Sequence, residues 1–537
     1  MLIKNPILTG FNPDPSFLRV GDDYYIATST FEWFPGVQIH HSRDLVNWRL
    51  LCHPLSRLSQ LDMRGCENSC GIWAPNLTYA DGQFWLIYTN VRSSGGPWKD
   101  TPNYLVTAPE IMGPWSEPVF LNASGFDPSL FHEKDGRKYL INMYWDGRSI
   151  KHRFAGIILQ EYDLKTHRLL GPVSNIWQGS SHRVTEGPNL YYRNGWYYLV
   201  CAEGGSGWNH VVSVARSRKI TGPYELHPEN PLLTSVGQPP TVLQKAGHGA
   251  WVETQTGDWY LAHLCSRPIF PENAPADAKL ETHGHSILGR ESALQRLVWG
   301  AYDWPRLAHG SNAPAWEVPA PQLPPHPWPD EPARDDFDSI SLNINFQSLR
   351  EPFDESWFSL SERPGWLRLR GRNSLYSTFE QSLLARRIQH FRFEVRTSVD
   401  FKPQTFQQMA GLIAYYDRKD YYYLRVTADD EGRRILGLAV SDNGVYREIP
   451  EAQIILDKAK PVHLQANLDH ARLQFSWSWD GRNWTDIGGA LDSTILSDEY
   501  GNTSCFTGAF FGLCCQDMSG TKINADFDYF EYCPFSV

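Results

Sequence analysis

The sequence predicts an all-β protein that consists of a five-bladed β-propeller followed by a β-sandwich domain. A unit of about sixty residues recurs five times in the first 300 residues. Aromatic residues, which favour strands, make up 13% of the chain. No stretch before residue 300 shows the sustained 3.6-residue apolar periodicity of a helix. Helices should therefore be few.

Each copy of the repeat begins with a small or acidic residue, or a histidine, before Pro or Gly. A short strand, a tight turn and an aromatic-rich strand follow. The copies are spaced by 60, 53, 60 and 61 residues. A single hairpin is marginal in water, whereas stacked copies bury each other's faces. Each copy has room for two more strands, and four strands repeated five times are typical of propeller blades. The copies begin at Asp14, Ala74, Asp127, Gly187 and His248.

The repeat stops near residue 310, where a proline-rich segment begins. Eight prolines lie within residues 311–336, which favours an extended and fairly stiff linker. Beyond it the chain alternates between apolar and polar residues without the sixty-residue repeat, as in ARLQFSWSW at 471–479. A β-sandwich is the simplest arrangement of such strands. We therefore predict a propeller over 1–312, a linker over 313–333 and a sandwich over 334–537.

Charge and composition restrict the partners. The net charge of −11 argues against nucleic acid and fits a small neutral substrate. The N-terminal apolar stretch is too short for a signal peptide, and no run is long enough to span a membrane. With no export signal, the nine cysteines are expected to be mostly reduced thiols in a cytoplasmic protein. The pairs Cys66/Cys70 and Cys514/Cys515 each lack the second pair that zinc needs, so we predict no metal site.

Three acids lie at or beside the start of a repeat copy, namely Asp14, Asp127 and Glu186, which directly precedes Gly187. The first strand of each propeller blade lies against the central channel, so residues at these starts should converge on one axis. Acids gathered there repel one another, and structure alone gives little reason to collect them. The alternative is that the aspartates are turn residues before proline and that Glu186 is a solvated loop acid. Three acids at equivalent positions favour a functional site.

Glycoside hydrolysis needs two carboxyl groups. One protonates the leaving oxygen and must keep its proton near neutral pH, while the other attacks the anomeric carbon or activates a water molecule. A third acid can keep the proton on the first by like-charge repulsion. The prolines after Asp14 and Asp127 are expected to hold each backbone extended and so to preorganise the groups.

Several motifs resemble those of glycoside hydrolase family 43, and specifically its two-domain β-xylosidases. The resemblance covers nearly the whole chain. Its motifs are NPDPS at 12–16, WAPN at 73–76, GFDPS at 125–129, TEGPNL at 185–190, LGRES at 288–292, DDFD at 335–338 and CFTGAFFG at 505–512. Family members often carry Thr where this chain has Ser292, and the hydroxyl is retained.

The resemblance implies an inverting reaction and a role for each acid. Asp14 would be the general base that deprotonates the attacking water, and Glu186 the general acid on the leaving group. Asp127 would raise the Glu186 pKa and orient that side chain. Arg290 would contact the hydroxyls of the bound sugar and the base. The expected wall of the sugar pocket is made of Phe31, Trp73 and Trp145.

Two further residues have competing interpretations. Some members of the family hold a calcium ion near the position of His248, and others do not. We expect His248 to be a hydrogen-bonded core histidine beside the sugar, with no cofactor required. Phe506 is either the aromatic that reaches over the mouth of the site from the second domain or a core aromatic.

The resemblance therefore implies an exo-acting β-D-xylosidase. Such an enzyme releases xylose from the non-reducing end of short xylo-oligosaccharides, and many similar enzymes also release α-L-arabinofuranose. Alternatives are a main activity on arabinofuranosides, a retaining fructosidase, which the FNPDPSF start disfavours, and a carbohydrate-binding propeller without activity. We expect a homo-oligomer, either a dimer or a tetramer, because relatives assemble in this way.

Overall fold

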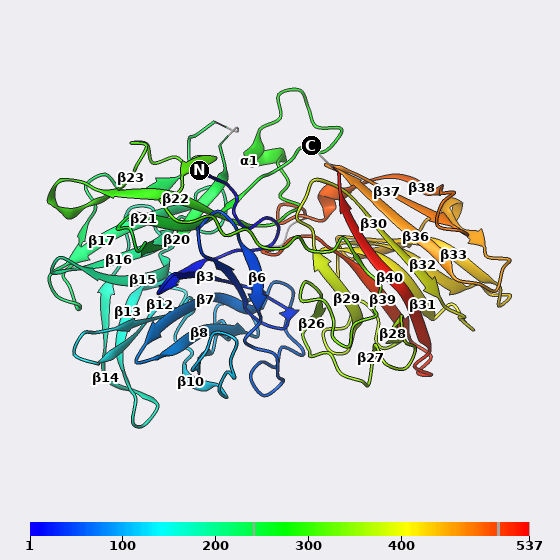
Figure 1. Cartoon of the computed structure of the whole chain (residues 1–537), viewed down its shortest axis with the longest axis horizontal. Helices are drawn as coiled ribbons and strands as arrows, with labels where there is room; N and C mark the ends of the chain where they lie inside the picture. The colour runs from blue at the N-terminus through cyan, green and yellow to red at the C-terminus, as the bar shows by residue number, and fades with distance from the viewer. Residues whose placement is uncertain (240–241, 502–504, 536–537) are drawn as a thin grey trace. The chain divides into compact units, whose positions relative to one another are not determined.

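The computed structural model describes residues 1–239, 242–501 and 505–535. The chain divides into two compact units (Figure 1). Unit 1 comprises Met1–Arg267 with Arg290–Trp328, and unit 2 comprises Pro268–Gly289 with Pro329–Val537. Within the described residues the single α-helix is α1 (Leu280–His283), beside three short 3-10 helices. The prediction of an all-β protein with few helices is confirmed.

Unit 1 is a five-bladed β-propeller, as predicted, and each repeat copy forms one blade. Every blade is an antiparallel sheet whose strands pair in chain order. The first strands of successive blades contact one another, and β20 of blade 5 contacts β2 of blade 1, which closes the ring. The strands are, for blade 1, β2 (Ser16–Val20), β3 (Asp23–Thr28), β5 (Gln38–Ser42) and β6 (Arg49–Cys52); for blade 2, β7 (Gly71–Ala80), β8 (Gln83–Val91), β9 (Asn103–Ala108) and β10 (Val119–Asn122); for blade 3, β11 (Ser129–His132), β12 (Lys138–Trp145), β13 (Phe154–Asp163) and β14 (Arg168–Trp177); for blade 4, β15 (Glu186–Arg193), β16 (Trp196–Glu203), β17 (Val211–Ser217), β18 (Glu225–Leu226) and β19 (Leu233–Thr234); and for blade 5, β20 (Gln244–Glu253), β21 (Trp259–Ser266), β22 (Glu291–Trp299) and β23 (Pro305–Leu307).

Polar side chains at the third position of the repeat link the inner strands to one another. The Leu77 backbone N–H donates to Ser16 Oγ at 2.9 Å, which joins blades 2 and 1. Asn76 Nδ2 donates to Asn189 Oδ1 at 3.0 Å, which joins blades 2 and 4. Asn189 Nδ2 donates to the Gly249 carbonyl at 3.3 Å, which joins blades 4 and 5. The repeat thus places buried amides and hydroxyls where they satisfy one another.

The first position of every copy has the same unusual backbone conformation. The φ angles there are 56°, 21°, 53°, 56° and 49°, in the left-handed region. The expectation that proline holds Asp14 and Asp127 extended is therefore wrong, because proline disfavours the right-handed helical region before it but does not exclude the left-handed one. The shared conformation indicates that the five positions are equivalent. They are Asp14, Ala74, Asp127, Gly187 and His248.

The N-terminal segment closes the propeller against blade 5. β1 (Leu2–Lys4) pairs antiparallel with β24 (Glu317–Pro319), which lies within the proline-rich segment. Leu8 forms a bridge with Ser292 of β22. The Asn12 backbone N–H donates to the Arg290 carbonyl at 2.9 Å. The chain thus brings the segment that precedes Asp14 beside the strand that follows Arg290.

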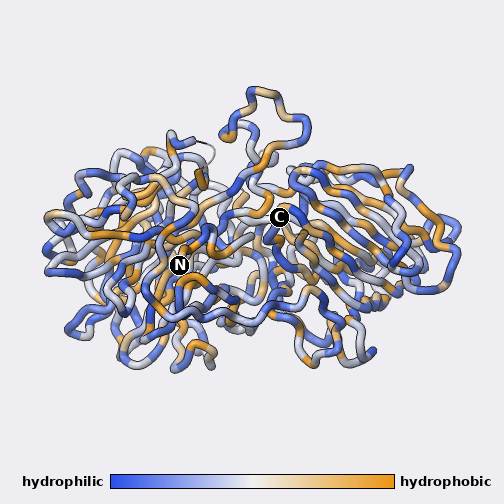
Figure 2. Tube along the Cα trace, turned by 45° about the horizontal axis from the view of Figure 1, so that its top comes forward, coloured by the Kyte–Doolittle hydropathy of each residue, from blue (hydrophilic) through white to orange (hydrophobic). Residues whose placement is uncertain are grey.

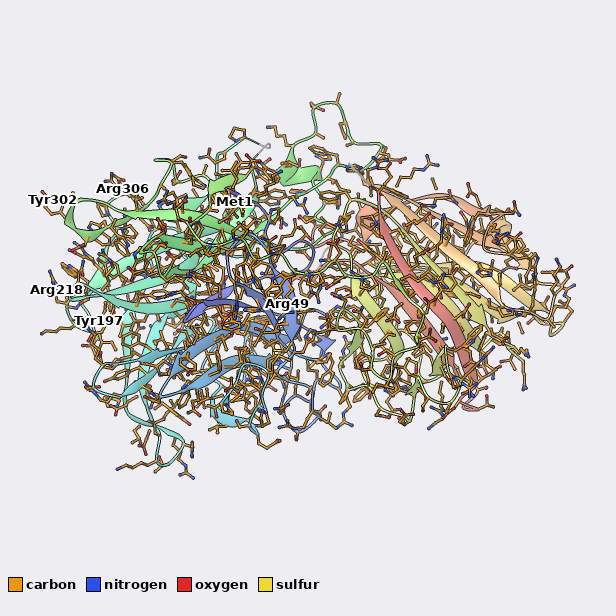
Figure 3. The ribbon with its side chains drawn as sticks, in the orientation of Figure 1. Met1, Arg49, Tyr197, Arg218, Tyr302 and Arg306 are labelled. Atoms are coloured by element: carbon orange, nitrogen blue, oxygen red, sulfur yellow. The ribbon has the colours of Figure 1, made fainter. Side chains whose placement is uncertain are left out.

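Aromatic residues stabilise the periphery of unit 1 as well as its centre. Between blades 4 and 5 the Arg216 guanidinium lies 4.0 Å from the ring centroid of Trp196 and 3.9 Å from that of Trp304. The Arg218 guanidinium lies 3.6 Å from the centroid of the same Trp196 ring. Arg218 and Tyr302 lie at the outer margin of unit 1 (Figure 3). Cation–π pairs of this kind give some of the tryptophan residues a structural role.

Unit 2 is a sandwich of two antiparallel sheets. One sheet has the order β27-β28-β40-β30-β36-β37-β38 with β25 on β40, and the other includes β34-β33-β32-β31-β39-β29-β26 with β35 on β33. The strands are β25 (Arg334–Asp335), β26 (Gln347–Leu349), β27 (Phe358–Ser359), β28 (Leu367–Arg370), β29 (Ser382–Arg387), β30 (Arg392–Asp400), β31 (Gln408–Tyr415), β32 (Tyr421–Ala428), β33 (Arg434–Asp442), β34 (Val445–Glu448), β35 (Ile454–Ile455), β36 (Val462–Asp469), β37 (Arg472–Ser478), β38 (Thr485–Asp492), β39 (Phe510–Asp517) and β40 (Asn524–Pro534).

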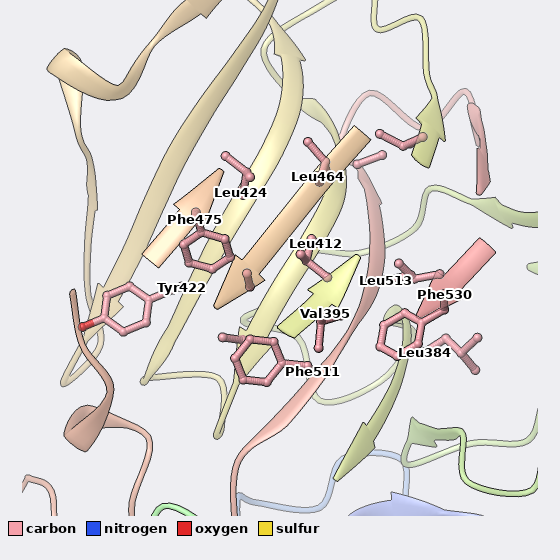
Figure 4. Close-up of a cluster of buried hydrophobic side chains, with 14 of the residues drawn as sticks. Leu384, Val395, Leu412, Tyr422, Leu424, Leu464, Phe475, Phe511, Leu513 and Phe530 are labelled. Carbon is pink, nitrogen blue, oxygen red and sulfur yellow. The ribbon is translucent and has the colours of Figure 1, made fainter. Parts of the chain in front are cut away.

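The core of unit 2 lies between its two sheets. Leu412, Leu424 and Leu513 of one sheet and Leu464 and Phe475 of the other belong to one buried cluster (Figure 4). Figure 2, in which hydrophobic residues are orange, shows hydrophobic and hydrophilic stretches alternating along the chain in both units. Burial of these apolar side chains is the main favourable term in folding.

The segment Pro268–Gly289 leaves blade 5 after β21 and packs within unit 2 before the chain returns to β22. The Ser286 N–H and Oγ each donate to the Glu499 carboxylate at 2.7 Å. The Ala509 N–H donates to the Ile287 carbonyl at 2.9 Å. No feature of the repeat predicted this excursion.

Candidate active site

Asp14 lies at the start of blade 1 and is only 6% exposed. Ser29 Oγ donates to its Oδ2 at 2.7 Å, and Arg290 Nη1 donates to its Oδ1 at 3.0 Å. His248 Nδ1 lies 3.9 Å from the same Oδ1. Burial raises the pKa of Asp14, but Arg290, His248 and Ser29 together outweigh burial and hold the pKa below its usual value. Asp14 is therefore an ionised carboxylate at neutral pH.

The pKa values of Asp127 and Glu186 are raised, whereas that of Asp14 is lowered. Burial raises the pKa of Asp127 well above its usual range, and repulsion by Glu186 and then Asp14 adds to that effect. Burial, followed by repulsion from Asp14, raises the pKa of Glu186 to about 8, although Arg290 and Lys99 oppose the shift. Two interacting carboxyls share their protons, so the pair holds a proton near neutral pH.

The contact with His248 explains why the acid of blade 4 lies one residue before the equivalent position. Gly187 occupies the equivalent position with φ of 56°, and a Cβ there would lie 2.8 Å from His248 Cε1. A side chain at this position has no room, so the acid comes from Glu186, the first residue of β15. Asp127 Oδ2 accepts the Gly187 N–H at 3.0 Å. Asp127 thus contacts the backbone directly beside Glu186.

Two histidines complete the centre of unit 1. His248 is 6% exposed, and burial lowers its pKa although Asp14 favours the protonated form. His210 is 1% exposed, and burial lowers its pKa to about 3, with the charges of His248 and Arg290 adding to the effect. Both imidazoles are therefore neutral near pH 7. The repeat alignment missed His210, because it precedes β17 and not an inner strand.

The predicted aromatic residues lie in a chain of ring contacts. The ring centroids of Phe31 and Trp73 are 6.1 Å apart, Trp73 and Phe126 are 5.2 Å apart, and Phe126 and Trp145 are 6.0 Å apart. The Arg290 guanidinium lies 5.4 Å from the Phe31 ring centroid. The structure therefore brings Phe31, Trp73 and Trp145 together, and the Arg290 contact connects them to Asp14. The sequence did not identify Phe126 as the linking ring.

Lys99 belongs to the same cluster and was not predicted. Its Nζ lies 4.9 Å from the Trp145 ring centroid and 5.7 Å from that of Trp73, and it donates to the Ser94 carbonyl at 2.8 Å. Burial lowers the pKa of Lys99, while the charge of Glu186 favours the protonated form. Lys99 lies in the loop between β8 and β9, outside the repeated segments, so periodicity carries no signal for it.

Phe506 lies in unit 2, in the segment 505–509, which has no regular secondary structure. Its expected role at the mouth of the site stays a prediction. Within the described part of the chain, no cluster of three or more His, Cys, Asp or Glu side chains is arranged to hold a metal ion. No helix among these residues is long and apolar enough to cross a membrane.

The chain matches known proteins along nearly its whole length. Residues 3–305 match the model of glycosyl hydrolases family 43, and residues 334–533 match that of the beta xylosidase C-terminal concanavalin A-like domain. A xylan 1,3-beta-xylosidase of a Vibrio species is 54% identical over 533 residues, which cover 99% of both chains. Xylosidase/arabinosidase 43B of Humicola insolens is 48% identical over 541 residues, which cover 99% of this chain and 98% of that one.

A solved structure agrees with the fold of the whole chain. The crystal structure of xylan beta-1,4-xylosidase from Bacillus halodurans C-125 is 52% identical and superposes with a TM-score of 0.95. The match covers 99% of this chain and 100% of the other. The propeller, the clustered carboxyls and the family models are mutually consistent, and the first model alone spans more than half of the residues. The chain therefore belongs to glycosyl hydrolase family 43.

Proposed function

We propose that this protein is an exo-acting, inverting β-D-xylosidase with α-L-arabinofuranosidase side activity. Its substrates would be short β-1,4-xylo-oligosaccharides, from which it releases xylose at the non-reducing end. The proposal rests on two pKa values that shift in opposite directions within one cluster. The pKa of Asp14 is lowered, and the pKa of Glu186 is raised to about 8. A base that is ionised and an acid that is protonated at one pH are what glycoside hydrolysis requires.

In the proposed reaction, Asp14 takes a proton from a water molecule while the water oxygen attacks the anomeric carbon. The bond between that carbon and the glycosidic oxygen breaks, and Glu186 gives its proton to the departing oxygen. The water oxygen enters on the face opposite the leaving group, so the configuration inverts. Proton exchange with solvent then returns Asp14 to the ionised form and Glu186 to the protonated form.

The other residues around Asp14 and Glu186 would bind the sugar and orient the two catalytic carboxyls. Arg290 holds Asp14 through a charge-assisted hydrogen bond at 3.0 Å, which fixes the base and keeps it ionised. Asp127 accepts the Gly187 N–H beside Glu186, and repulsion between the Asp127 and Glu186 carboxylates disfavours ionisation of both. The rings of Phe31, Trp73 and Trp145 offer flat apolar faces of the kind that suit a pyranose.

The names of the relatives support xylose as the released sugar. The Humicola insolens relative, named a xylosidase/arabinosidase, supports the arabinofuranosidase side activity. The relatives differ in linkage, since one is a 1,3- and another a 1,4-xylosidase. Values of kcat/KM on β-1,4-xylobiose, β-1,3-xylobiose, an aryl β-D-xylopyranoside and an aryl α-L-arabinofuranoside would test the linkage and the sugar. We expect the highest values for β-1,4-xylobiose among the disaccharides and for the xyloside among the aryl glycosides.

A proton NMR time course on β-1,4-xylobiose tests substrate, bond position and stereochemistry together. Inversion at a β-linkage releases α-xylose first, before mutarotation. Initial release of β-xylose would indicate a retaining mechanism and exclude Asp14 as the base for water. Absence of xylose would leave the non-enzymatic carbohydrate-binding protein as the better description.

Substitution of the two proposed catalytic acids tests their roles. We expect Asp14→Ala and Glu186→Ala each to lower kcat by about 10²–10⁴-fold, the range typical of positioned proton transfer. Asp163→Asn, which removes an acid at the end of β13, serves as the control and should retain full activity. Wild-type turnover in either alanine variant would remove that residue from the mechanism.

The location and assembly are further parts of the proposal. We propose a cytoplasmic homo-oligomer, on the basis of the sequence features and family resemblance described above. Cell fractionation tests the location. Light scattering coupled to gel filtration tests the assembly, with a molar mass of two or four chains of 61.4 kDa as the expected result.

A further inference from the structure

Glu203 is a fully buried acid at the end of β16, with 0% exposure, and the mechanism above does not use it. Its carboxylate forms no ion pair with any residue that the structure describes. It accepts four hydrogen bonds instead. Oε1 accepts the Ser180 N–H at 2.7 Å and the Thr185 hydroxyl at 2.8 Å, while Oε2 accepts the hydroxyls of Ser180, at 2.5 Å, and of Ser213. Burial of a carboxylate costs free energy unless the group is hydrogen-bonded, and these four donors supply the hydrogen bonds that Glu203 needs.

Three of the four donors come from one loop. Ser180 and Thr185 belong to the segment between β14 and β15, which ends directly before Glu186. The fourth donor, Ser213, comes from the neighbouring strand β17. The Gly204 N–H, next along the chain from Glu203, donates to the Arg183 carbonyl at 2.8 Å. Glu203 and Gly204 together therefore anchor this loop to the end of β16.

The anchored loop has an unfavourable backbone conformation. Arg183 and Val184 are consecutive residues in the left-handed region, with φ of 59° and 51°. This region is especially unfavourable for a β-branched residue such as Val184, and such a conformation persists only where the surroundings hold it. Gly179 packs closely on the same network, since a Cβ there would lie 2.0 Å from Thr185 Oγ1 and 2.9 Å from Glu203 Oε1. The hydrogen bonds to Glu203 provide that support.

The same network fixes the strand register at Glu186. Glu186 pairs with Ala202, which immediately precedes Glu203 in β16. A hydrogen bond therefore joins the residue before Glu186 to the residue after its strand partner. We expect loss of this bond to loosen Thr185 and, through it, the first residue of β15.

We propose that Glu203 is a positioning residue for Glu186, which it places by holding Thr185 and the strained loop through its buried carboxylate. This inference rests on the role proposed above for Glu186 as general acid. In the proposed role, Glu203 does not touch the reacting atoms or the sugar. It acts through the backbone that precedes Glu186.

Variants that remove single hydrogen bonds test the proposal. Thr185→Val removes the hydroxyl beside Glu186 with little change in volume. Ser213→Ala removes a hydroxyl from the same carboxylate but leaves all three loop donors in place, so it is the matched control. Glu203→Gln keeps the shape and replaces one acceptor oxygen by a donor. Circular dichroism and thermal melting establish that each variant is folded, and Thr185→Val carries the test if Glu203→Gln is not.

Leaving-group dependence separates a displaced acid from general damage. Phenyl β-D-xylopyranoside needs protonation of its leaving oxygen, whereas 2,4-dinitrophenyl β-D-xylopyranoside does not. We expect Thr185→Val and Glu203→Gln to lower kcat/KM on the phenyl substrate by about 10- to 100-fold, as expected for a misplaced catalytic group. On the dinitrophenyl substrate the loss should stay below about 3-fold, because the acid contributes little to that reaction. Ser213→Ala should resemble the wild type on both.

The pH profile gives a second readout. The charged and titratable groups that face Glu186 are Asp14, Asp127, Arg290 and Lys99. A loosened Glu186 becomes more exposed to water, so the burial that raises its pKa decreases. Its proton is then lost at a lower pH, and the alkaline limb of kcat/KM on the phenyl substrate should move to lower pH in Thr185→Val.

Equal losses on both substrates, or an unmoved alkaline limb in a folded Thr185→Val, would overturn the proposal. So would Ser213→Ala behaving like Thr185→Val. Glu186→Gln distinguishes this failure from that of the proposed function. If Glu186→Gln loses activity only on the phenyl substrate while Thr185→Val does not, Glu203 has no positioning role. If Glu186→Gln keeps wild-type activity on the phenyl substrate, Glu186 is not the acid and the proposed function fails first.

Discussion

At the scale of single residues, Asp14 and Glu186 differ in their neighbours. Arg290 donates to Asp14 at 3.0 Å, and Ser29 supplies a further donor to the same carboxylate. Glu186 is affected by Asp14 as a repelling charge, and Arg290 only partly opposes the effect of burial. The arginine, the serine and the histidine beside Asp14 together divide a cluster of like residues into a base and an acid.

The pH dependence of activity follows from this division. The acidic limb of kcat/KM should reflect ionisation of Asp14, and the alkaline limb should lie near pH 8, where Glu186 loses its proton. In Arg290→Gln the burial that raises the pKa of Asp14 is less opposed, so the acidic limb should move to higher pH. Arg290→Lys keeps the charge and is the control. Identical acidic limbs in the two variants would contradict this electrostatic role.

Ionised Asp127 should lower the free energy of unfolding, although the residue is needed for activity. Its pKa is raised in the folded protein, so its contribution is least unfavourable below the pKa of the unfolded chain, and stability is lost as pH rises above that value. Asp127→Asn stays neutral and can still accept the Gly187 N–H. We expect it to raise the free energy of unfolding at pH 8 by roughly 1 kcal/mol or more, since each unit of pKa shift corresponds to about 1.4 kcal/mol.

Thermal melting of wild type and Asp127→Asn at pH 4 and pH 8 measures this difference. The variant should gain stability at pH 8 relative to its gain at pH 4, while kcat falls. A gain that is the same at both pH values would exclude the raised pKa of Asp127 as its cause.

At the scale of elements, the left-handed start of each inner strand determines which side chain reaches the cluster. Blade 4 has Gly187 at this position, where a Cβ would lie 2.8 Å from His248 Cε1. Gly187→Ala therefore combines backbone strain with a steric conflict. We expect a loss of about 1–3 kcal/mol in the free energy of unfolding, the range for an unfavourable φ, together with a fall in kcat because Glu186 is displaced.

Gly257→Ala provides the matched control for Gly187→Ala. Gly257 has φ of 82° in the turn between β20 and β21, and a Cβ there would meet nothing within 4 Å. It should lose stability through strain alone and keep its kcat. Chemical denaturation and steady-state assays measure both quantities. Equal activity losses in the two variants would show that the contact with His248 does not matter.

The repeat predicted the blades and the clustered acids because both depend on position within a periodic unit. Asp14 and Asp127 fall at one position, and a positive φ recurs there in all five copies. Lys99 and Glu203 were not predicted, because Lys99 lies in a loop within blade 2 and Glu203 ends the second strand of blade 4. The left-handed φ of Asp14 was also missed, since proline after it suggested an extended backbone. Tertiary packing selects these features, and local sequence patterns do not encode them.

At the scale of the whole molecule, the domain architecture was predictable from the change in periodicity near residue 310. The path of the chain between β21 and β22 was not. The segment Pro268–Gly289 packs within unit 2, where Ile287 and Leu288 join the buried cluster of the sandwich. The segment lacks the alternation of a strand, so its sequence gave no indication of the unit to which it belongs.

Closure of the propeller depends on contacts between the two ends of unit 1. Asn5 Nδ2 donates to the Leu294 carbonyl at 2.7 Å and to the Ala315 carbonyl at 2.9 Å, and Asn5 Oδ1 accepts the Leu294 N–H at 2.8 Å. One buried side chain thus joins the N-terminal segment, β22 and the proline-rich segment. Asn5→Ala would leave these backbone groups without that partner, each at a cost of about 1–3 kcal/mol when it stays buried and unsatisfied.

We therefore expect Asn5→Ala to lower the free energy of unfolding by about 2–4 kcal/mol, while kcat at 25 °C stays near the wild-type value because Asn5 lies outside the cluster of acids. Lys4→Ala removes an exposed neighbour on β1 and should change neither quantity. Differential scanning calorimetry with parallel assays makes the comparison. If unit 1 unfolds at the same temperature in Asn5→Ala and wild type, the ring is held closed by the β2–β20 contact and not by the N-terminal segment.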